Sequence, residues 1–119
     1  MIKVIIAGGR DFNDYELLKS FCDKQLVNHK DITIISGTAN GADKLGEKYA
    51  QEKGFLIERY PAQWDLYGKS AGHIRNQQMA DIATHCIVFW DKKSKGTKNM
   101  IEISTKQNIP LRICYYDTP

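Results

Sequence analysis

The sequence lacks a cysteine framework and any apolar run long enough to cross a membrane. Its three cysteines, Cys22, Cys86 and Cys114, are odd in number and share no C-x-x-C spacing. We therefore expect buried thiols in a reducing compartment, with neither a metal site nor a disulfide framework. Nowhere do 18 apolar residues run together, and the first residues do not resemble a signal peptide. These absences predict a cytoplasmic protein with no membrane partner.

A large excess of one charge is also missing. The 17 basic and 14 acidic residues give a net charge of +3 over 119 residues, and the lysines are scattered rather than gathered in a stripe. This balance tolerates an anionic small molecule but argues against nucleic acid as the partner. Repeats, low-complexity segments and linkers are absent too, so we expect one domain over residues 1–119. We do not expect a chain of this length to form a two-domain enzyme with a cleft between lobes, and a second subunit is expected to help complete the site. We expect a homo-oligomer, a dimer or a tetramer.

Apolar runs and helical patterns alternate along the chain. The expected strands cover residues 2–7, 32–36, 55–60, 85–90 and 111–116. The expected helices cover residues 13–29, 42–53, 70–83 and 97–108, with Asn13 and Ser70 as N-caps and Gly54 as the stop of the second helix. Residues 62–69 are expected to form an aromatic-rich loop. Because the strands are continuously apolar, we predict an α/β Rossmann-like three-layer sandwich with a mainly parallel five-stranded sheet.

The segments that follow four of the strands carry the unusual residues. The central one is Ile34–Asp43, where an apolar run breaks into Ser, Gly, Thr, Asn and Gly before a helix starts, which is typical of a phosphate-binding turn. Residues 8–12, 61–69 and 91–97 follow other strands. In an open parallel sheet, ligands bind outside the carboxyl ends of the strands, so these turns predict one shared site. The alternative is that the glycines serve only tight turns.

The residue types at this edge suit a nucleotide. Glycine-rich turns can donate amides to phosphate, Arg10, Lys69 and Arg75 can neutralise it, and Trp64, Tyr67 or Trp90 can stack on a base. Asp43 and Asp91 are candidates for binding sugar hydroxyls. The predicted ligand-binding residues are Gly8, Gly9, Arg10, Asp11, Phe12, Ser36, Gly37, Thr38, Ala39, Gly41, Ala42, Asp43, Trp64, Lys69, Arg75, Asn76, Trp90, Asp91, Ser94, Gly96 and Thr97.

Structural roles are the alternative for several of these side chains. Trp64 could cover the core, Arg75 could pair with a carboxylate, and Asp11 could cap its own turn. His73 has neither a Ser nor a Cys spaced to make a triad, so a solvent or capping role is expected for it.

Five ordered motifs resemble the YspA/YpsA-related branch of the SLOG superfamily. They are residues 7–12 (AGGRDF), 36–43 (SGTANGAD), 60–64 (YPAQW), 71–79 (AGHIRNQQM), and 89–91 (FWD) with 94–97 (SKGT). That superfamily includes the Lonely Guy phosphoribohydrolases and the Rossmann-like domain of the DNA-processing protein DprA. The resemblance implies a Rossmann-like sheet, frequent homo-oligomers, and a pocket for nucleotides or derivatives of NAD and ADP-ribose, with no other cofactor required.

One departure from that superfamily bears on catalysis. The Lonely Guy motif P-G-G-x-G-T-x-x-E matches here at Gly96-Thr97, but the glycine pair before it is missing and Met100 stands at the Glu position. Glu102 lies two residues on and faces another way on a helix. The resemblance therefore favours binding over hydrolysis. If the protein is an enzyme, the candidate catalytic residues are Glu102, Asp43, Asp91 and Arg75.

Three functions follow from these observations. The first is capture of a nucleotide-derived small molecule, an ADP-ribose or NAD derivative or a cyclic-nucleotide signal, for sensing or sequestration. The second is an N-glycoside hydrolase of the Lonely Guy type. The third is single-stranded DNA binding by analogy with DprA.

Overall fold

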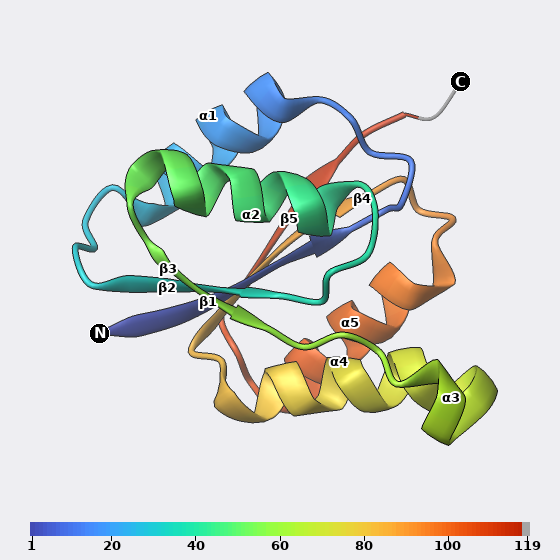
Figure 1. Ribbon diagram of the computed structural model, residues 1–119. Coiled ribbons are helices and arrows are strands. Elements are labelled where there is room, and N and C mark those ends of the chain that lie inside the picture. Colours follow the sequence, from blue (N-terminus) through green and yellow to red (C-terminus); the bar gives the residue numbers. More distant parts are fainter. Residues whose placement is uncertain (118–119) are drawn as a thin grey trace.

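The structure, a computed structural model, describes residues 1–117 and contains five strands with helices between them (Figure 1). In chain order the elements are β1 (Ile2–Gly8), α1 (Tyr15–Leu26), β2 (Ile32–Ser36), α2 (Ala42–Lys53), β3 (Leu56–Arg59), α3 (Trp64–Tyr67), the 3-10 turn η1 (Gly68–Ser70), α4 (Ala71–Ile82), β4 (His85–Trp90), α5 (Lys95–Lys106) and β5 (Leu111–Tyr115). Within residues 1–117, no helix has both the length and the apolar character needed to cross a bilayer.

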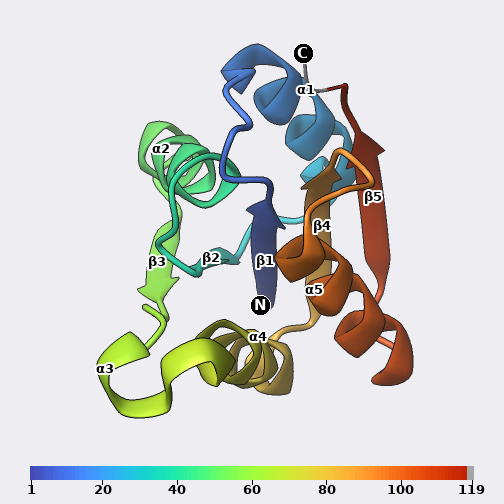
Figure 2. The ribbon, with the colours of Figure 1, turned by 90° about the vertical axis from the view of Figure 1, so that its right-hand side faces the viewer.

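All five strands are parallel and lie in the order β3-β2-β1-β4-β5. The chain moves outward from β1 to β2 and β3, then returns through α4 to place β4 on the other side of β1. The sheet order therefore reverses between β1 and β4. In doubly wound folds such a switch point is where the crevice for a ligand opens. Figure 2 looks onto this carboxyl edge, with the starts of α2 and α5 on either side of the end of β1.

The helices cover both faces of the sheet. Alternate residues of β1 point to opposite faces, as the strand period of two requires. Val4 and Ile6 pack with α1 and α2, whereas Ile5 and Ala7 pack with α4 and α5. The predicted three-layer Rossmann-like sandwich is confirmed, with a sheet that is parallel throughout.

Two helix starts differ from the sequence prediction. The N-cap of α1 is Asp14 rather than Asn13, because the Asp14 carboxylate accepts the Leu17 N–H at 3.1 Å. Helix α5 starts at Lys95, two residues earlier than predicted, because Ser94 caps it by accepting the Thr97 N–H at 3.3 Å.

The expected loop over residues 62–69 is largely helical. It contains α3 and η1, which run directly into α4. Ser70 stands at the N-cap position of α4, but its side chain makes no capping bond and its backbone is already helical (φ −84°, ψ −7°). The 3-10 turn continues into α4, so the chain does not need a side-chain cap there.

Candidate functional site: a cationic cavity at the carboxyl edge

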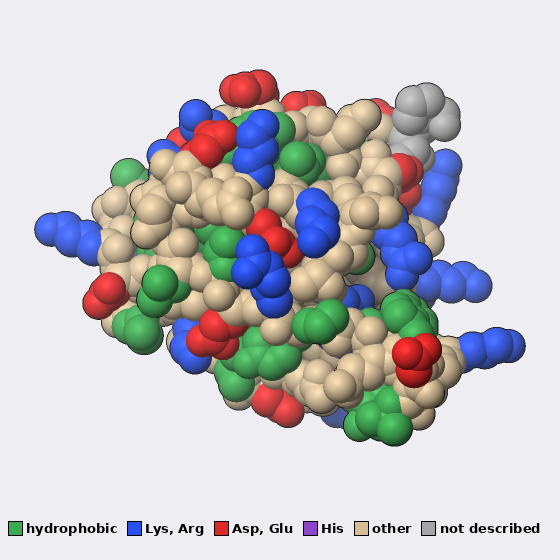
Figure 3. Space-filling model, viewed as in Figure 1, with side chains coloured by type: hydrophobic (Ala, Val, Ile, Leu, Met, Phe, Trp, Pro, Cys, Tyr) green, Lys and Arg blue, Asp and Glu red, His purple; other side chains and the backbone are tan. Residues whose placement is uncertain are grey.

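A cavity of about 540 Å³ opens at the switch point of the sheet. Its walls are the end of β1, the start of α2, the α3–α4 segment and the start of α5. Four segments that are far apart in the sequence therefore meet at one edge. Figure 3 shows a recess between α3 and the body of the molecule, with Lys and Arg side chains beside it.

Most of the predicted ligand-binding residues line this cavity. They are Gly8, Gly9, Arg10, Asp11, Ala39, Asp43, Trp64, Lys69, Arg75, Asn76, Asp91, Ser94, Gly96 and Thr97. Gly37 and Thr38 line a smaller neighbouring cavity. Phe12, Ser36, Gly41, Ala42 and Trp90 line neither cavity.

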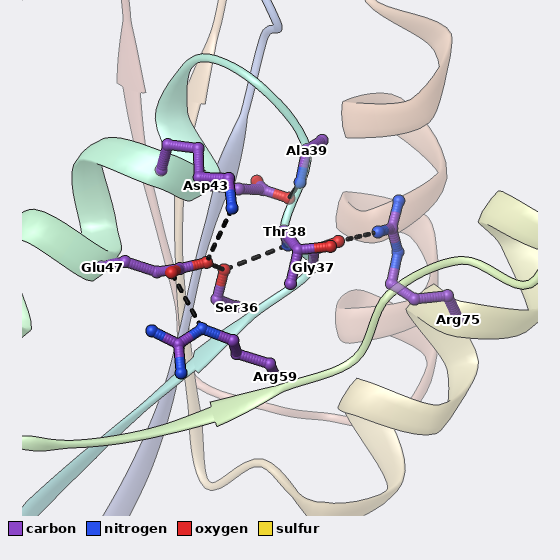
Figure 4. A network of polar contacts seen from close by, with 9 residues as sticks. Ser36, Gly37, Thr38, Ala39, Asp43, Glu47, Arg59 and Arg75 are labelled. Carbon is purple, nitrogen blue, oxygen red and sulfur yellow. Dashed lines mark hydrogen bonds and ion pairs between the residues drawn. The ribbon is translucent and has the colours of Figure 1, made fainter.

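The turn between β2 and α2 was predicted as the phosphate seat, and three of its amides are hydrogen-bonded within the chain (Figure 4). The Thr38 N–H donates to the Ser36 hydroxyl at 3.0 Å, and the Ala39 N–H donates to the Asp43 carboxylate at 3.1 Å. The first amide of α2, from Ala42, donates to the Gly9 carbonyl oxygen at 3.2 Å. These three donors are committed within the chain and are not available to a bound anion.

The glycines of this turn are required by close packing. A Cβ at Gly37 would lie 2.7 Å from the Asp43 carboxylate and 2.6 Å from an Arg75 nitrogen. Gly41 has a φ of +79°, and a Cβ there would overlap the Gly9 carbonyl oxygen. At these two positions, the alternative reading of the glycines as residues of a tight turn accounts for the structure.

Ser36 has a structural role. Its hydroxyl donates to the Glu47 carboxylate at 2.6 Å, and the same carboxylate accepts from the Arg59 guanidinium at 2.9 Å. Glu47 is buried on α2, so the two donors compensate a carboxylate that would otherwise be costly to bury. This network ties β2 and β3 to α2 behind the cavity (Figure 4).

Asp43 is the acidic group inside the cavity wall. It is only 5% exposed, and burial raises the pKa of its carboxyl to about 6. The Ala39 N–H and the charge of Arg75 oppose this rise by favouring the ionised form. Asp43 is therefore a carboxyl that titrates just below neutral pH within the cavity.

Arg75 joins α4 to the turn after β2. Its terminal nitrogen donates to the Gly37 carbonyl oxygen, and its Nε donates to the Asn76 side chain at 3.0 Å. Burial lowers the pKa of Arg75, and the nearby charge of Arg10 lowers it further. The charge of the Asp43 carboxylate opposes this lowering of the pKa, so both a like charge and an opposite charge act on Arg75.

The start of α5 also lies at the cavity. As a helix terminus, it leaves the N–H groups of Lys95 and Gly96 without intrahelical partners, and a Cβ at Gly96 would meet nothing within 4 Å. Lys69 and Lys93 line the same cavity. Cationic side chains and the positive end of a helix therefore line the same cavity.

Two polar residues support the start of α5. The Asp91 carboxylate accepts the Lys93 and Ser94 N–H groups, both at 2.8 Å, and these bonds lower the pKa of Asp91. The buried Asn76 donates to the Asn99 side chain at 2.9 Å and to the Gly96 carbonyl oxygen at 3.3 Å. Both residues line the cavity, but these bonds commit much of their hydrogen-bonding capacity to positioning the loop.

The aromatic residues divide between core and cavity. Phe12 stacks on Phe89 in the core with ring centroids 4.9 Å apart. Trp90 packs against Tyr115, and its indole N–H donates to the Ser94 carbonyl oxygen at 3.1 Å, so it is not positioned to stack on a base. Trp64 remains, since it is half exposed and lines both cavities.

Sequence reasoning missed three polar residues at the site. His73 and Lys93 line the cavity, and the His73 side chain is exposed, in keeping with the solvent role expected for it. The third is Tyr116, whose hydroxyl donates to the Asp11 carboxylate at 2.8 Å and lies against Gly9. His73 sits in the Arg-Asn motif, which is a usable signal, whereas nothing in the sequence links Tyr116 to Asp11.

The catalytic candidates are not all in one place. Glu102 lines a different cavity with Gln77 and Lys106, on the outer side of α4 and α5. Asp43, Asp91 and Arg75 line the main cavity, as does the buried Met100 that stands at the position of the Lonely Guy Glu. Glu102 therefore cannot replace that Glu in this cavity.

The fold and the cavity define a Rossmann-like α/β protein with a charged site at the carboxyl edge of its sheet, lined by four cationic and three acidic side chains. A family model described as the YspA, cpYpsA-related SLOG family matches residues 2–67, more than half of the chain. The chain belongs to this family.

Known proteins that are similar to the chain include a phage protein and a DNA-processing protein of solved structure. The Gene 61 protein of Mycobacterium phage D29 is 29% identical over 126 residues that cover the whole of both chains. A solved structure of DNA processing protein A from Helicobacter pylori, described for its single-stranded DNA binding mode, shares the fold with a TM-score of 0.65 at 20% identity. That similarity covers 94% of this chain and 64% of the other, so this chain spans less than two thirds of its length.

Proposed function

We propose that the main cavity binds a nucleotide-derived small molecule, of the ADP-ribose, NAD-derivative or cyclic-nucleotide type, for sensing or sequestration. The observation that carries this proposal is the convergence of Arg10, Lys69, Arg75 and Lys93 with the start of α5 around one cavity. Guanidinium, ammonium and helix-terminal amides are the groups that bind phosphate. Membership of the SLOG family and the Rossmann-like fold support a nucleotide-related ligand.

The geometry favours binding over turnover. Met100 places a thioether where the Lonely Guy enzymes have a carboxylate, and Glu102 lines another cavity. Asp43 is the carboxyl in the main cavity whose pKa is raised. If the protein is a hydrolase, Asp43 is therefore the candidate for the acid–base role.

Calorimetric titration with ADP-ribose, NAD, AMP and cyclic AMP tests the proposal. Lys69→Ala removes a cation from the cavity, and we expect about a tenfold loss of affinity, as for one charge-assisted hydrogen bond. Lys30→Ala is the matched control, because the exposed Lys30 precedes β2 at the opposite edge of the sheet and should leave affinity unchanged. Lack of binding across this panel would contradict the proposal.

The same incubations distinguish an enzyme from a binding protein. Mass spectrometry of the recovered ligand should return it intact, while release of free base would favour the hydrolase. In that case Asp43→Asn should abolish base release, because the variant cannot hold or move the proton.

A second candidate is single-stranded DNA, since the solved structure that shares the fold is described for that binding mode. Four cationic side chains line the cavity. If all four met phosphates, the logarithm of affinity would fall with the logarithm of salt concentration with a slope of about −3. Fluorescence anisotropy with a labelled oligothymidylate between 50 and 200 mM salt measures this slope. Tight binding with that slope, competed by neither ADP-ribose nor AMP, would favour DNA over a small molecule.

A further inference from the structure

A second cavity adjoins the first and shares a wall with it. It has a volume of about 280 Å³ and lies between the β2–α2 turn and the segment after β3. The residues that line both cavities are Arg10, Ala39, Trp64 and Arg75. The smaller volume falls just below the roughly 300–1,000 Å³ of typical small-molecule sites, and the larger lies within that range. The second cavity therefore suits an extension of the first site better than a separate one.

The shared wall carries two guanidinium groups from different elements. Arg10 follows β1, and Arg75 belongs to α4 and donates to the Gly37 carbonyl oxygen in the turn after β2. A guanidinium can bind two phosphate oxygens at once, so two of them on one wall suit a pyrophosphate.

The two cavities differ in chemistry on either side of this wall. The first contains the start of α5 and charged side chains of both signs: Lys69 and Lys93, and Asp11, Asp43 and Asp91. The second is lined, apart from the wall, by uncharged residues that include Asn40, Pro61 and Ala62. The indole of Trp64 belongs to both. The second cavity thus suits an uncharged ring, a base or a sugar, that extends from a phosphate at the wall.

We infer that the site takes a two-armed ligand, in which a pyrophosphate joins a nucleoside to a second sugar or nucleoside, with one arm in each cavity and the pyrophosphate at Arg10 and Arg75. This inference rests on the proposed function and narrows it. A mononucleotide, cyclic or linear, fills only one arm. A ligand of the ADP-ribose type fills both.

Calorimetric titration with ADP-ribose and AMP tests the two-armed fit. In the unmodified protein we expect ADP-ribose to bind at least tenfold more tightly than AMP. Asn40→Phe fills the second cavity from the β2–α2 turn, and Ala62→Phe fills it from the segment after β3. Both should bring the ratio of the two affinities close to one. Asn28→Phe is the matched control, since Asn28 is an exposed turn residue that lines neither cavity, and it should keep the full ratio.

The outcomes separate the two proposals. Equal affinities for ADP-ribose and AMP in the unmodified protein would overturn the two-armed ligand while leaving a nucleotide site intact. A ratio that survives both phenylalanine substitutions in folded variants would overturn it as well. If neither ADP-ribose nor AMP binds, the proposed function is contradicted, and so is the two-armed ligand that rests on it.

Discussion

Replacing Asp43 by Asn should change how the stability of the protein depends on pH. The Asp43 carboxyl is 5% exposed, and burial raises its pKa from 3.8 to about 6. Between these two values the folded protein binds more protons than the unfolded chain, so stability falls as pH rises. The full effect is about 3 kcal/mol, of which about 2.5 kcal/mol falls between pH 4 and pH 7.5.

Urea denaturation followed by tryptophan fluorescence measures this effect. Asn keeps an oxygen to accept the Ala39 N–H but does not ionise. The free energy of unfolding of the native protein minus that of Asp43→Asn should therefore decrease by about 2.5 kcal/mol from pH 4 to pH 7.5. Taking the difference cancels the other titrating groups. The exposed Asp31→Asn serves as the control for losing one negative charge. Parallel stability curves for the native protein and Asp43→Asn would refute the argument that burial dominates this carboxyl.

Two further predictions concern the segments around the cavity. Gly41→Ala should destabilise the protein by about 2 kcal/mol in urea denaturation, because the new Cβ would overlap the Gly9 carbonyl oxygen at a φ of +79°. Gly96→Ala is its matched control in open helical surroundings and should stabilise the protein by about 0.5 kcal/mol; destabilisation by both would contradict the packing argument. Tyr116→Phe should cost about 1 kcal/mol through the lost bond to Asp11. A double-mutant cycle with Asp11→Ala measures that coupling, and a coupling energy near zero would show that the bond does not hold the loop.

The strands were largely predictable because their local signal agrees with their tertiary environment. The predicted bounds of β2 and β4 match the structure, and the predictions for the other three differ from it by one residue or by one at each end. Continuous runs of β-branched residues suit a strand covered on both faces, so propensity and burial point the same way. The helix starts were less predictable. Adjacent Asn13 and Asp14 are both good caps, and three-dimensional geometry selects Asp14.

The alternation of strands and helices also predicted where the site lies. Parallel strands place all their carboxyl ends at one edge, so Gly9, Gly37, Arg75 and Gly96 were expected to meet. Gly9, Arg75 and Gly96 line one cavity, and Gly37 lines the adjoining one. What local sequence does not encode is which groups remain free there. The Asp43 carboxylate and the Gly9 carbonyl oxygen accept hydrogen bonds from amides of the β2–α2 turn. The glycine pattern had predicted that these amides would bind a ligand.

By itself, then, the sequence determined the parallel α/β sandwich and the edge at which its polar turns gather, because both follow from periodicity along the chain. Tertiary structure decided which amides of the β2–α2 turn are bonded within the chain, that Phe12 lies in the core, that Trp90 lines neither cavity, and that Tyr116 holds Asp11. These outcomes depend on hydrogen-bond partners and packing neighbours that belong to distant segments of the chain. Local sequence does not specify those partners, because they come together only in the folded protein.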